Sequence, residues 1–454
     1  KKSNSFKARG NVIVKQGDSI ELFSENLDYD GNNRKIIAKK NVIFNSNNSN
    51  LKTQILFHDR DLKEIYFEKG GVIKDSTNTI KSTEGKYFLE SSKYEFKERV
   101  NVYNNDNDIK SIKLDYYSNT EKVFFYGPTV ITGKDYRIFS EKGYYNTKSK
   151  NGFFNTKAKI EYNNRIIKGD SLIFDDLKKY ASGTKNVSII DTLNKTIIKG
   201  DFAEIFKDLD SAMVTKNSYA IKLLEKDSLF IKADTLFAVG PNESRFIKGR
   251  YNVKFFKTNM SGKSDKFIMN QKNGLIKLIR NKLSKREEQI LTSKEISKKN
   301  PIIWNGESQM TGDEIHIIRN TKTNQLDSLK ILNNAFVIEK DSFGIDNYNQ
   351  MKGIDLFGNF KDNELEKIKL NRNTEMVYYL YDEESKDLIG IDKAICSSIL
   401  MTINNNKIDE IIFYTNPEGK VYPEDDLEIN QKILNGFNWR IDEKILNKKN
   451  FLSK

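Results

Sequence analysis

The stretch GNVIVKQGDSIELFSENLDYDGNNRKIIAKKNVIF, residues 10–44, decides the fold. Apolar residues alternate with polar ones, a polar turn follows, and the alternation then resumes. Alternation with a period of two indicates a β-strand with one buried and one solvent-facing side, and the Asp, Gly, Asn and Lys between two such runs indicate a tight turn. The stretch therefore predicts an amphipathic β-hairpin.

The same design recurs along the chain. Each copy begins with an apolar anchor residue that is followed closely by Ser, Gly or Ala and often by an acid. The first nine anchors, separated by 27 to 32 residues, are Ile20, Leu51, Ile80, Ile109, Tyr136, Ile166, Ile197, Leu229 and Met260. The second half of each copy alternates again: Ile36, Ala38, Val42 and Phe44 share one face, and later Phe96, Val100 and Val102 do so.

A hairpin of this size is not stable alone, but stacked hairpins bury a continuous apolar seam. We therefore predict an all-β, elongated antiparallel fold of about twelve stacked hairpins of ~30 residues each. The repeat array is expected to run continuously over residues 1–425. The segment SKREEQILTSKEISKK, residues 284–299, is predicted to be an insertion with a short helix, and residues 426–454 a C-terminal tail or cap.

Composition excludes several classes of protein. The single Cys396 excludes an intrachain disulfide, and two His residues exclude a His-rich metal site. No apolar run approaches the ~20 residues of a membrane-spanning helix. The net charge of +13 is spread along every segment. This distribution fits a solvated surface or an anionic partner, and it argues against a nucleic-acid patch.

The recurring Gly–Asp pairs, Gly169–Asp170, Gly200–Asp201 and Gly312–Asp313, stand at the same place in their copies. Paired carboxylates would suit a glycosidase. A residue that recurs in every unit, however, serves the turn or the sheet register more readily than one active site. We therefore expect no enzyme activity, no catalytic residue, no metal and no cofactor.

Residues 10–44 also resemble the repeat of the LptA/OstA family of lipopolysaccharide-transport proteins. The shared pattern is a strand opening GNV, a strand ending in L-x-Y-D, a short turn and a strand finishing in NV. It is carried by Gly10, Asn11, Val12, Val14, Gly17, Asp18, Leu27, Tyr29, Asp30, Ala38, Asn41 and Val42. Degenerate copies cover nearly the whole chain, as in the long OstA-like proteins of Bacteroidetes-type bacteria. The chain departs from the family in its length, in the insertion and in a less regular final third.

The resemblance implies an open β-jellyroll (a β-taco) whose two sheets face one another. It implies a periplasmic bridge that carries lipopolysaccharide from the inner to the outer membrane, with the acyl chains in an apolar cleft and the sugars at the open edge. The implied partners are lipopolysaccharide, the inner- and outer-membrane transport proteins joined by end-to-end strand addition, and a second copy of the chain. The implied location is the periplasm, with membrane association at one or both ends.

The predicted lipid-binding residues are the apolar residues that point inward. They are Val12, Val14, Ile20, Leu22, Leu27, Tyr29, Ile36, Val42, Phe44, Phe96, Val100, Val102, Ile160, Leu172, Val187, Val253 and Phe255. For each of them alone, a place in a packed core is the simpler interpretation, and the hypothesis concerns the face as a whole.

The alternative hypothesis is an extracellular β-solenoid or adhesin. Such a protein would hold a saccharide or a protein on aromatic ladders of its outer face, and its interior would be dry and packed. The two hypotheses share the repeat and differ in which face of the strands carries the function.

Overall fold

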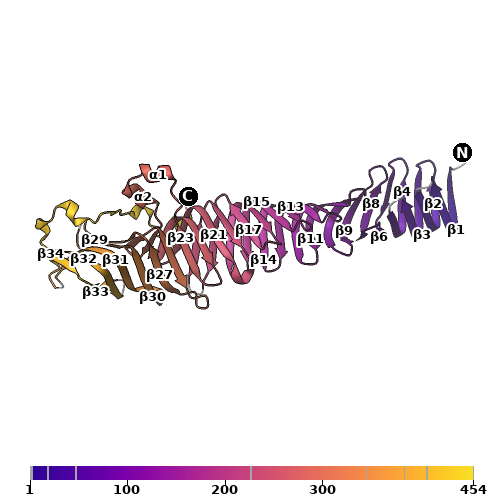
Figure 1. Ribbon diagram of the computed structural model, residues 1–454. Coiled ribbons are helices and arrows are strands. Elements are labelled where there is room, and N and C mark those ends of the chain that lie inside the picture. The colour runs from indigo at the N-terminus through magenta and orange to yellow at the C-terminus, as the bar shows by residue number, and fades with distance from the viewer. Residues whose placement is uncertain are drawn as a thin grey trace. The chain divides into compact units, whose positions relative to one another are not determined.

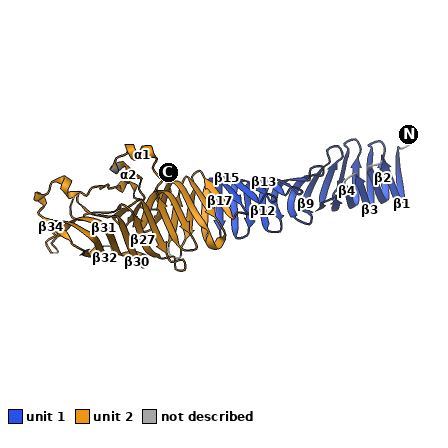
Figure 2. Cartoon of the chain, in the orientation of Figure 1, with its two compact units in different colours: residues 1–192, 201–208 blue, residues 193–200, 209–454 orange. Residues whose placement is uncertain are grey.

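The structure is a computed structural model that describes residues 4–17, 20–46, 49–224, 227–344, 346–382, 384–404 and 407–452. The chain is all-β with stacked antiparallel strands, which confirms the predicted fold class (Figure 1). It divides into two compact units (Figure 2). Unit 1 comprises residues 1–192 and 201–208, and unit 2 comprises residues 193–200 and 209–454.

The strands of unit 1 are antiparallel, and most follow one another in the sheet in chain order. They are β1 (Ser5–Gln16), β2 (Ile20–Asp30), β3 (Lys35–Ser46), β4 (Ser49–Asp59), β5 (Glu64–Phe67), β6 (Gly71–Lys74), β7 (Thr79–Ser82), β8 (Glu84–Phe88), β9 (Lys93–Tyr103), β10 (Asp108–Tyr117), β11 (Lys122–Thr132), β12 (Tyr136–Asn146), β13 (Asn151–Tyr162), β14 (Arg165–Asp175) and β15 (Tyr180–Asp191). The next strand, β16 (Thr196–Phe206), contributes residues to both units.

Among its described residues, unit 2 continues with shorter strands, three α-helices, short 3-10 turns and two long strands near its end. Its elements are β17 (Ser211–Thr215), β18 (Tyr219–Leu223), β19 (Ser228–Lys232), β20 (Thr235–Val239), β21 (Phe246–Lys257), β22 (Met260–Asn270), β23 (Leu275–Ile279), α1 (Lys285–Ile290), α2 (Ser293–Lys299), β24 (Ile302–Asn305), β25 (Ser308–Thr311), β26 (Glu314–Arg319), β27 (Leu326–Leu332), β28 (Ala335–Lys340), β29 (Tyr348–Gly353), β30 (Asp355–Lys361), β31 (Glu364–Tyr381), β32 (Leu388–Asn404), β33 (Lys407–Tyr414), β34 (Glu418–Tyr422) and α3 (Lys448–Leu452). Helices α1 and α2 lie between β23 and β24, within the segment 284–299 that the sequence analysis interpreted as an insertion.

Each long strand is folded over at its middle, at a place we call the corner. In β3 the corner is Lys40–Asn41, where both residues have positive φ (65° and 50°) and the register shifts by a bulge. Asn tolerates this left-handed conformation better than most residues, because its short polar side chain can bond locally. Asn41 and Val42, which end the strand in the family pattern, lie inside β3 in this chain.

The fold-over is seen most directly in β12. The hydroxyls of Tyr136 and Tyr145, at opposite ends of this strand, are 2.8 Å apart. In a straight strand the two Cα atoms would be separated by roughly 30 Å. The two halves of each strand therefore belong to two sheets that face one another, with the inward side chains between them.

In β3 the corner inserts two residues and keeps the alternation in phase. Ile36 and Ala38 before the corner and Val42 and Phe44 after it are all buried, as the sequence predicted. In β2, by contrast, the phase changes, because Leu22 and Ser24 are buried before the corner and Leu27 after it. At the strand ends, hairpin turns are closed by an Asx residue. The Oδ1 atom of Asp30, for example, accepts hydrogen bonds from the backbone amides of Asn32 and Asn33 at 3.0 and 3.2 Å.

The turns form two rows, which we call lip 1 and lip 2. In unit 1, lip 1 contains the turns β2–β3, β4–β5, β8–β9, β10–β11, β12–β13 and β14–β15, and lip 2 contains the turns β6–β7, β9–β10, β11–β12 and β13–β14. In unit 2, lip 1 contains the turns β22–β23 and β26–β27, and lip 2 contains the connections β18–β19 and β21–β22. We call the seam between the lips the mouth, because there the interior would meet solvent if the two sheets separated.

The C-terminal tail lies on the outer face of unit 2 (Figure 1). Leu427 and Leu434 pack on a cluster of outward-facing residues in β28, β31 and β32. The buried Gln350 holds the tail backbone twice, since its amide donates to the Lys432 carbonyl and accepts from the Leu434 amide, both at 2.9 Å. Within the described residues, no helix combines the length and the apolarity that crossing a bilayer requires.

Candidate lipid-binding interior and its mouth

The predicted lipid-binding residues lie on the inward face of the strands. Thirteen are buried: Leu22, Leu27, Ile36, Val42, Phe44, Phe96, Val100, Val102, Ile160, Leu172, Val187, Val253 and Phe255. The other four, Val12, Val14, Ile20 and Tyr29, are half-buried and belong to β1 and β2, at the first edge of unit 1. Burial places these residues inward, and their contact with lipid stays a prediction. Asp18, from the family motif, lies outside the described residues.

The inward residues form continuous apolar rows across neighbouring strands. Leu27 in β2 pairs with Ala38 in β3, which pairs with Leu56 in β4. All three are at most 1% exposed. Such a face attracts hydrocarbon in proportion to area, at about 25 cal/mol per Å², and without directional bonds. It could hold an acyl chain and let it slide, provided that the two sheets part to admit it.

The mouth of unit 1 is closed by hydrogen bonds between the lips. The Tyr116 hydroxyl, next to lip 1, donates to the Asp75 carboxylate in lip 2 and accepts from the Asn78 amide at 3.1 Å. The same Asn78 amide group donates to the Thr147 hydroxyl at 3.2 Å. Tyr116 and Asn78 are 0% and 2% exposed, so these bonds are shielded from water.

Further along the mouth the pattern repeats. The Oδ1 atom of Asn107 in lip 2 accepts from the hydroxyls of Tyr136 at 2.6 Å and Tyr145 at 3.2 Å. Burial raises the pKa of Tyr136 to about 12, so its hydroxyl remains a donor at neutral pH. Lys150 pairs with Asp106 at 3.0 Å across the same seam.

The last contact between the two lips of unit 1 is made by Lys207. Its ammonium lies 3.1 Å from Asp135 in lip 2 and 3.5 Å from Asp176 in lip 1. It also lies over the rings of Tyr136 and Tyr162, 5.7 and 5.2 Å from their centroids. We call the whole set from Asp75 to Lys207 the mouth ladder. The resemblance implied an open edge, whereas the mouth of unit 1 is closed along the mouth ladder, because polar side chains from both lips bond to one another there.

The recurring Gly–Asp pairs belong to the corners. The Oδ2 atom of Asp170 in β14 accepts from the Asn186 side-chain amide in β15 at 2.9 Å. Asp313 and Asn334 repeat this contact at 3.3 Å. Each acid thus bonds to the side chain of an Asn that holds positive φ in the corner of a neighbouring strand. This arrangement supports the predicted role in register. Among the described residues, no cluster of His, Cys, Asp or Glu could hold a metal ion.

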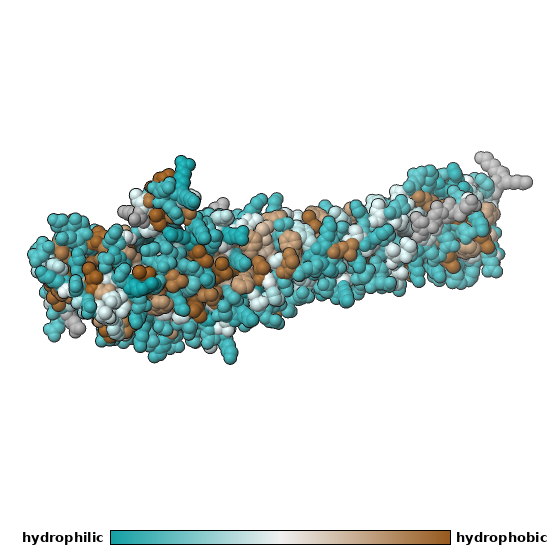
Figure 3. Space-filling view, viewed as in Figure 1, coloured by the Kyte–Doolittle hydropathy of each residue, from teal (hydrophilic) through white to brown (hydrophobic). Residues whose placement is uncertain are grey.

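The outer face of unit 1 carries aromatic residues that the sequence reasoning did not single out. Tyr117, Phe124, Tyr144 and Phe153 form a row across β10 to β13, with successive ring centroids 5.6, 5.7 and 6.4 Å apart. They occupy the solvent-facing positions of the alternation, which is the signal that could have revealed them. In the space-filling view, hydrophilic residues cover most of the visible surface, and hydrophobic ones gather more densely over unit 2 (Figure 3).

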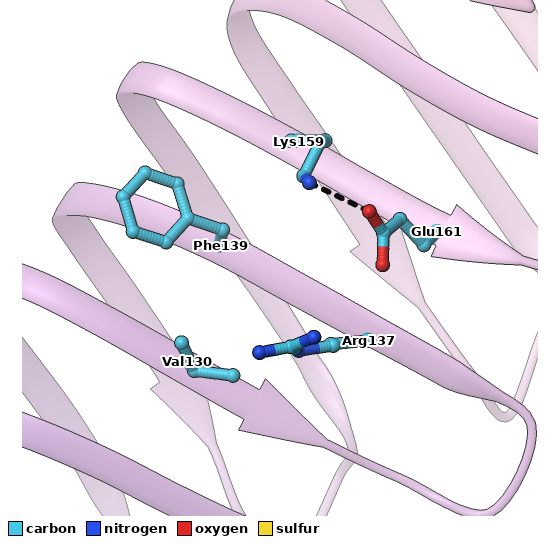
Figure 4. A pocket seen from close by; sticks show the side chains of 5 residues that line it. All are labelled: Val130, Arg137, Phe139, Lys159 and Glu161. Carbon is cyan, nitrogen blue, oxygen red and sulfur yellow. Dashed lines mark ion pairs between the residues drawn. The ribbon is translucent and has the colours of Figure 1, made fainter.

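A shallow hollow lies on the outer face of the sheet beside lip 2, whereas the aromatic row lies on the sheet beside lip 1. Its volume is about 260 Å³, and Val130, Arg137, Phe139, Lys159 and Glu161 line it (Figure 4). Lys159 and Glu161 form an ion pair of 2.6 Å, and Arg137 comes from the neighbouring strand β12. Because the ion pair compensates one of the two cations, the hollow has a modest net positive charge.

The fold and its interior define a class: an antiparallel β-repeat protein whose strands fold over a continuous apolar interior. The sequence model of the family described as OstA-like protein matches residues 1–113. The N-terminal region of the chain is therefore OstA-like, which confirms the predicted resemblance to the LptA/OstA family there.

One solved structure similar to the chain is LptH, the LptA-homologous periplasmic component of the lipopolysaccharide transport device of Pseudomonas aeruginosa. The two share 14% identity over 27% of this chain and 85% of LptH, with a TM-score of 0.24. No curated protein sequence matches the chain.

Proposed function

We propose that the chain is a periplasmic bridge protein that binds lipopolysaccharide acyl chains on its inward apolar face and passes them from the inner to the outer membrane. The OstA-like region of residues 1–113 carries this proposal. The continuous inward rows, such as Leu27, Ala38 and Leu56, support it, because they supply a non-directional surface along which hydrocarbon can slide.

The bridge would assemble by strand addition at β1. Within the described residues, β1 pairs only with β2, so one edge of β1 presents unpaired backbone groups. Such an edge is a template for a strand of another chain. The half-buried Val12 and Val14 would then become fully covered. The partner would be a membrane-anchored transport protein or a second copy of this chain.

Transport of acyl chains along the interior requires the two lips to separate. The mouth ladder consists of individual hydrogen bonds, each of which contributes about 0.5–1.5 kcal/mol, or up to ~3 kcal/mol where a charged group takes part. Local separation over one or two hairpins breaks only a few of these bonds, and the entering acyl chain would cover the apolar surface that the separation exposes. The closed mouth is the resting state in this proposal, and lipid would occupy an opened segment that moves along the array.

The test uses photo-crosslinking amino acids at the buried positions Val42, Val100 and Val187. Matched controls place the same amino acid at the next residues, Ile43 and Asn101, which point outward. Lipopolysaccharide adducts in cells are expected at the inward positions and not at the outward ones. Adducts at the outward positions alone, or at none of these positions, would contradict the proposal.

The closed mouth and the outer aromatic row favour a second candidate, an extracellular binding protein with a packed interior. Aromatic faces on solvent-facing strand positions suit the stacking of saccharide rings. If this candidate is right, the double variant F124A/Y144A no longer binds saccharides on a glycan array. The crosslinkers at the inward positions then give no lipopolysaccharide adducts. If the bridge proposal is right, the same double variant keeps its inward adducts.

A further inference from the structure

A small apolar cavity lies at the mouth of unit 2. Its walls come from both sheets: Phe255 and Met260 on the side of lip 2, and Phe267, Met269 and Ile317 on the side of lip 1. Its volume is about 30 Å³. That is room for roughly one methylene group, so a longer chain would have to displace side chains. The Met residues suit such adaptation, since the thioether side chain is flexible and polarisable.

Three cations line the same cavity: Lys222, Lys257 and Arg319. Each is the last inward residue of its strand, after an apolar series on the same face. The series are Ala220 then Lys222 in β18, Val253 and Phe255 then Lys257 in β21, and Ile315 and Ile317 then Arg319 in β26. Lys222 and Lys257 come from the side of lip 2, and Arg319 comes from the side of lip 1. Positive charge therefore stands at the mouth on both sides, directly above hydrocarbon walls.

The charges of Lys257 and Arg319 are not balanced by ion pairs with carboxylates of the described residues. Arg319 is 8% exposed and donates to the Asn324 side-chain carbonyl. Burial lowers the pKa of Arg319. Burial also lowers the pKa of Lys257, and the carboxylate of Asp227 only partly offsets this effect. Buried cations without counter-charges are costly, which is why they are usually paired.

The mouth of unit 1 shows how the same fold otherwise treats a buried cation. Lys207 sits between the carboxylates of Asp135 and Asp176, both within ion-pair distance. The equivalent inward positions beside the lips of unit 1 also hold neutral groups such as Tyr116 and Tyr145. The uncompensated charge of unit 2 is thus a local feature, and the repeat does not require it.

We propose that this cavity binds an anionic amphiphile, with the phosphate or carboxylate head between Lys257, Arg319 and Lys222 and the first methylenes of the chain against the apolar walls. The head would lie against Lys257 and Arg319, neither of which forms an ion pair with a carboxylate of the described residues. This inference rests on the proposed function, because lipid A is an acylated phosphate. Free fatty acids and alkyl phosphates share the same chemistry.

The experiment measures binding of the full-length chain by isothermal titration calorimetry with four probes: dodecyl phosphate, sodium laurate, dodecanol and bisphosphorylated lipid A in a non-ionic detergent. The variants are Lys257→Met and Arg319→Gln, which remove one charge each. The matched control is Lys272→Met, an exposed lysine in lip 1. Arg319→Lys restores the charge and guards against loss of fold, and thermal unfolding is recorded for every variant.

We expect dodecyl phosphate and lipid A to bind the unaltered chain, and dodecanol not to bind. Lys257→Met and Arg319→Gln should each weaken binding at least tenfold, while Lys272→Met and Arg319→Lys should stay within twofold. Equal binding of lipid A to all variants would overturn this site and leave the bridge proposal standing. Binding of laurate and dodecyl phosphate without lipid A would support the site and contradict the bridge. Binding of none of the probes would overturn both.

Discussion

The mouth ladder makes a quantitative prediction about access to the interior. Replacing Tyr116 with Phe removes the hydroxyl that joins Asp75 and Asn78 without changing the ring. Asp75 keeps two backbone donors, the amides of Thr77 at 2.8 Å and Asn78 at 2.6 Å, so its carboxylate is not left unpaired. A hydrogen bond to a charged group contributes about 1.5–3 kcal/mol, and we expect the lower part of that range, about 2 kcal/mol.

A free-energy change of about 2 kcal/mol raises the population of the open mouth roughly 30-fold. The assay places a cysteine at Val100, an interior position that is 2% exposed, in a chain whose buried Cys396 is replaced by Ser. The rate of maleimide labelling follows the open population when reclosing is faster than the reaction. Labelling of V100C should therefore accelerate by one to one and a half orders of magnitude in Y116F.

The control is a cysteine at Val253 in unit 2, which is 1% exposed. Its labelling rate should not change, because distant sites contribute independently. A V100C rate within twofold of the parent would refute the ladder as the barrier to access. Equal acceleration at both positions would refute it as well, since that result indicates global unfolding.

Three further predictions concern the tail, the corners and pH. Replacing Gln350 with Leu should leave two backbone groups of the tail, including the Leu434 amide, without partners at a cost of about 2–4 kcal/mol, and limited trypsin digestion should then release the tail faster. Replacing Asn186 with Val should lower the free energy of unfolding in urea by about 2–3 kcal/mol, because a β-branched residue is strained at φ 51° and the bond to Asp170 is lost, whereas Gly should cost less. Burial lowers the pKa of His58 to about 4, so the unfolded chain binds a proton between pH 6.5 and 4 that the folded chain does not. Stability should therefore be lost as the pH falls through this window, by up to ~3 kcal/mol, and His58→Leu should remove that part of the pH dependence.

Each of these predictions has an outcome that contradicts it. Unchanged digestion of Q350L would mean that the apolar contacts alone hold the tail. A stability of N186V equal to that of N186G would show that the corner tolerates any backbone conformation. A pH profile that His58→Leu leaves unaltered between pH 4 and 6.5 would show that His58 is not kept neutral by burial.

The all-β fold class was predicted correctly from the sequence, and so was the burial of residues such as Val42 and Phe44, because both depend on local patterning. Alternation placed Val100 and Val102 inward, and the hairpin turns followed from their Asx and Gly residues. The corner was missed. In β3 the two-residue insertion at Lys40–Asn41 leaves the period of two unchanged, so a folded strand and a straight one give the same pattern of apolar residues. In β2 the inward positions change parity between Leu22 and Leu27, a signal of the corner that the sequence interpretation did not use.

The state of the mouth could not be predicted from the sequence. Asn78 meets Thr147 although 69 positions separate them. Such pairs form because the stacked hairpins place lip 2 opposite a part of lip 1 that comes later in the chain. The same holds for Lys257 and Arg319, which resemble any other lysine or arginine of a basic chain until the strands set them over one cavity.

By itself, then, the stretch of residues 10–44 determined an amphipathic hairpin that must stack, since an apolar face repeated every ~30 residues can be buried only against its neighbours. The tertiary structure alone decided that each strand folds over, that polar side chains close the mouth of unit 1 from Asp75 to Lys207, and that Lys257 and Arg319 stand at the mouth of unit 2 without an ion pair to a carboxylate of the described residues. The physical reason is the sequence separation of the residues that interact. Alternation and turns are set by residues a few positions apart, whereas hydrogen bonds, ion pairs and burial across the mouth depend on which distant turns the stacking brings together.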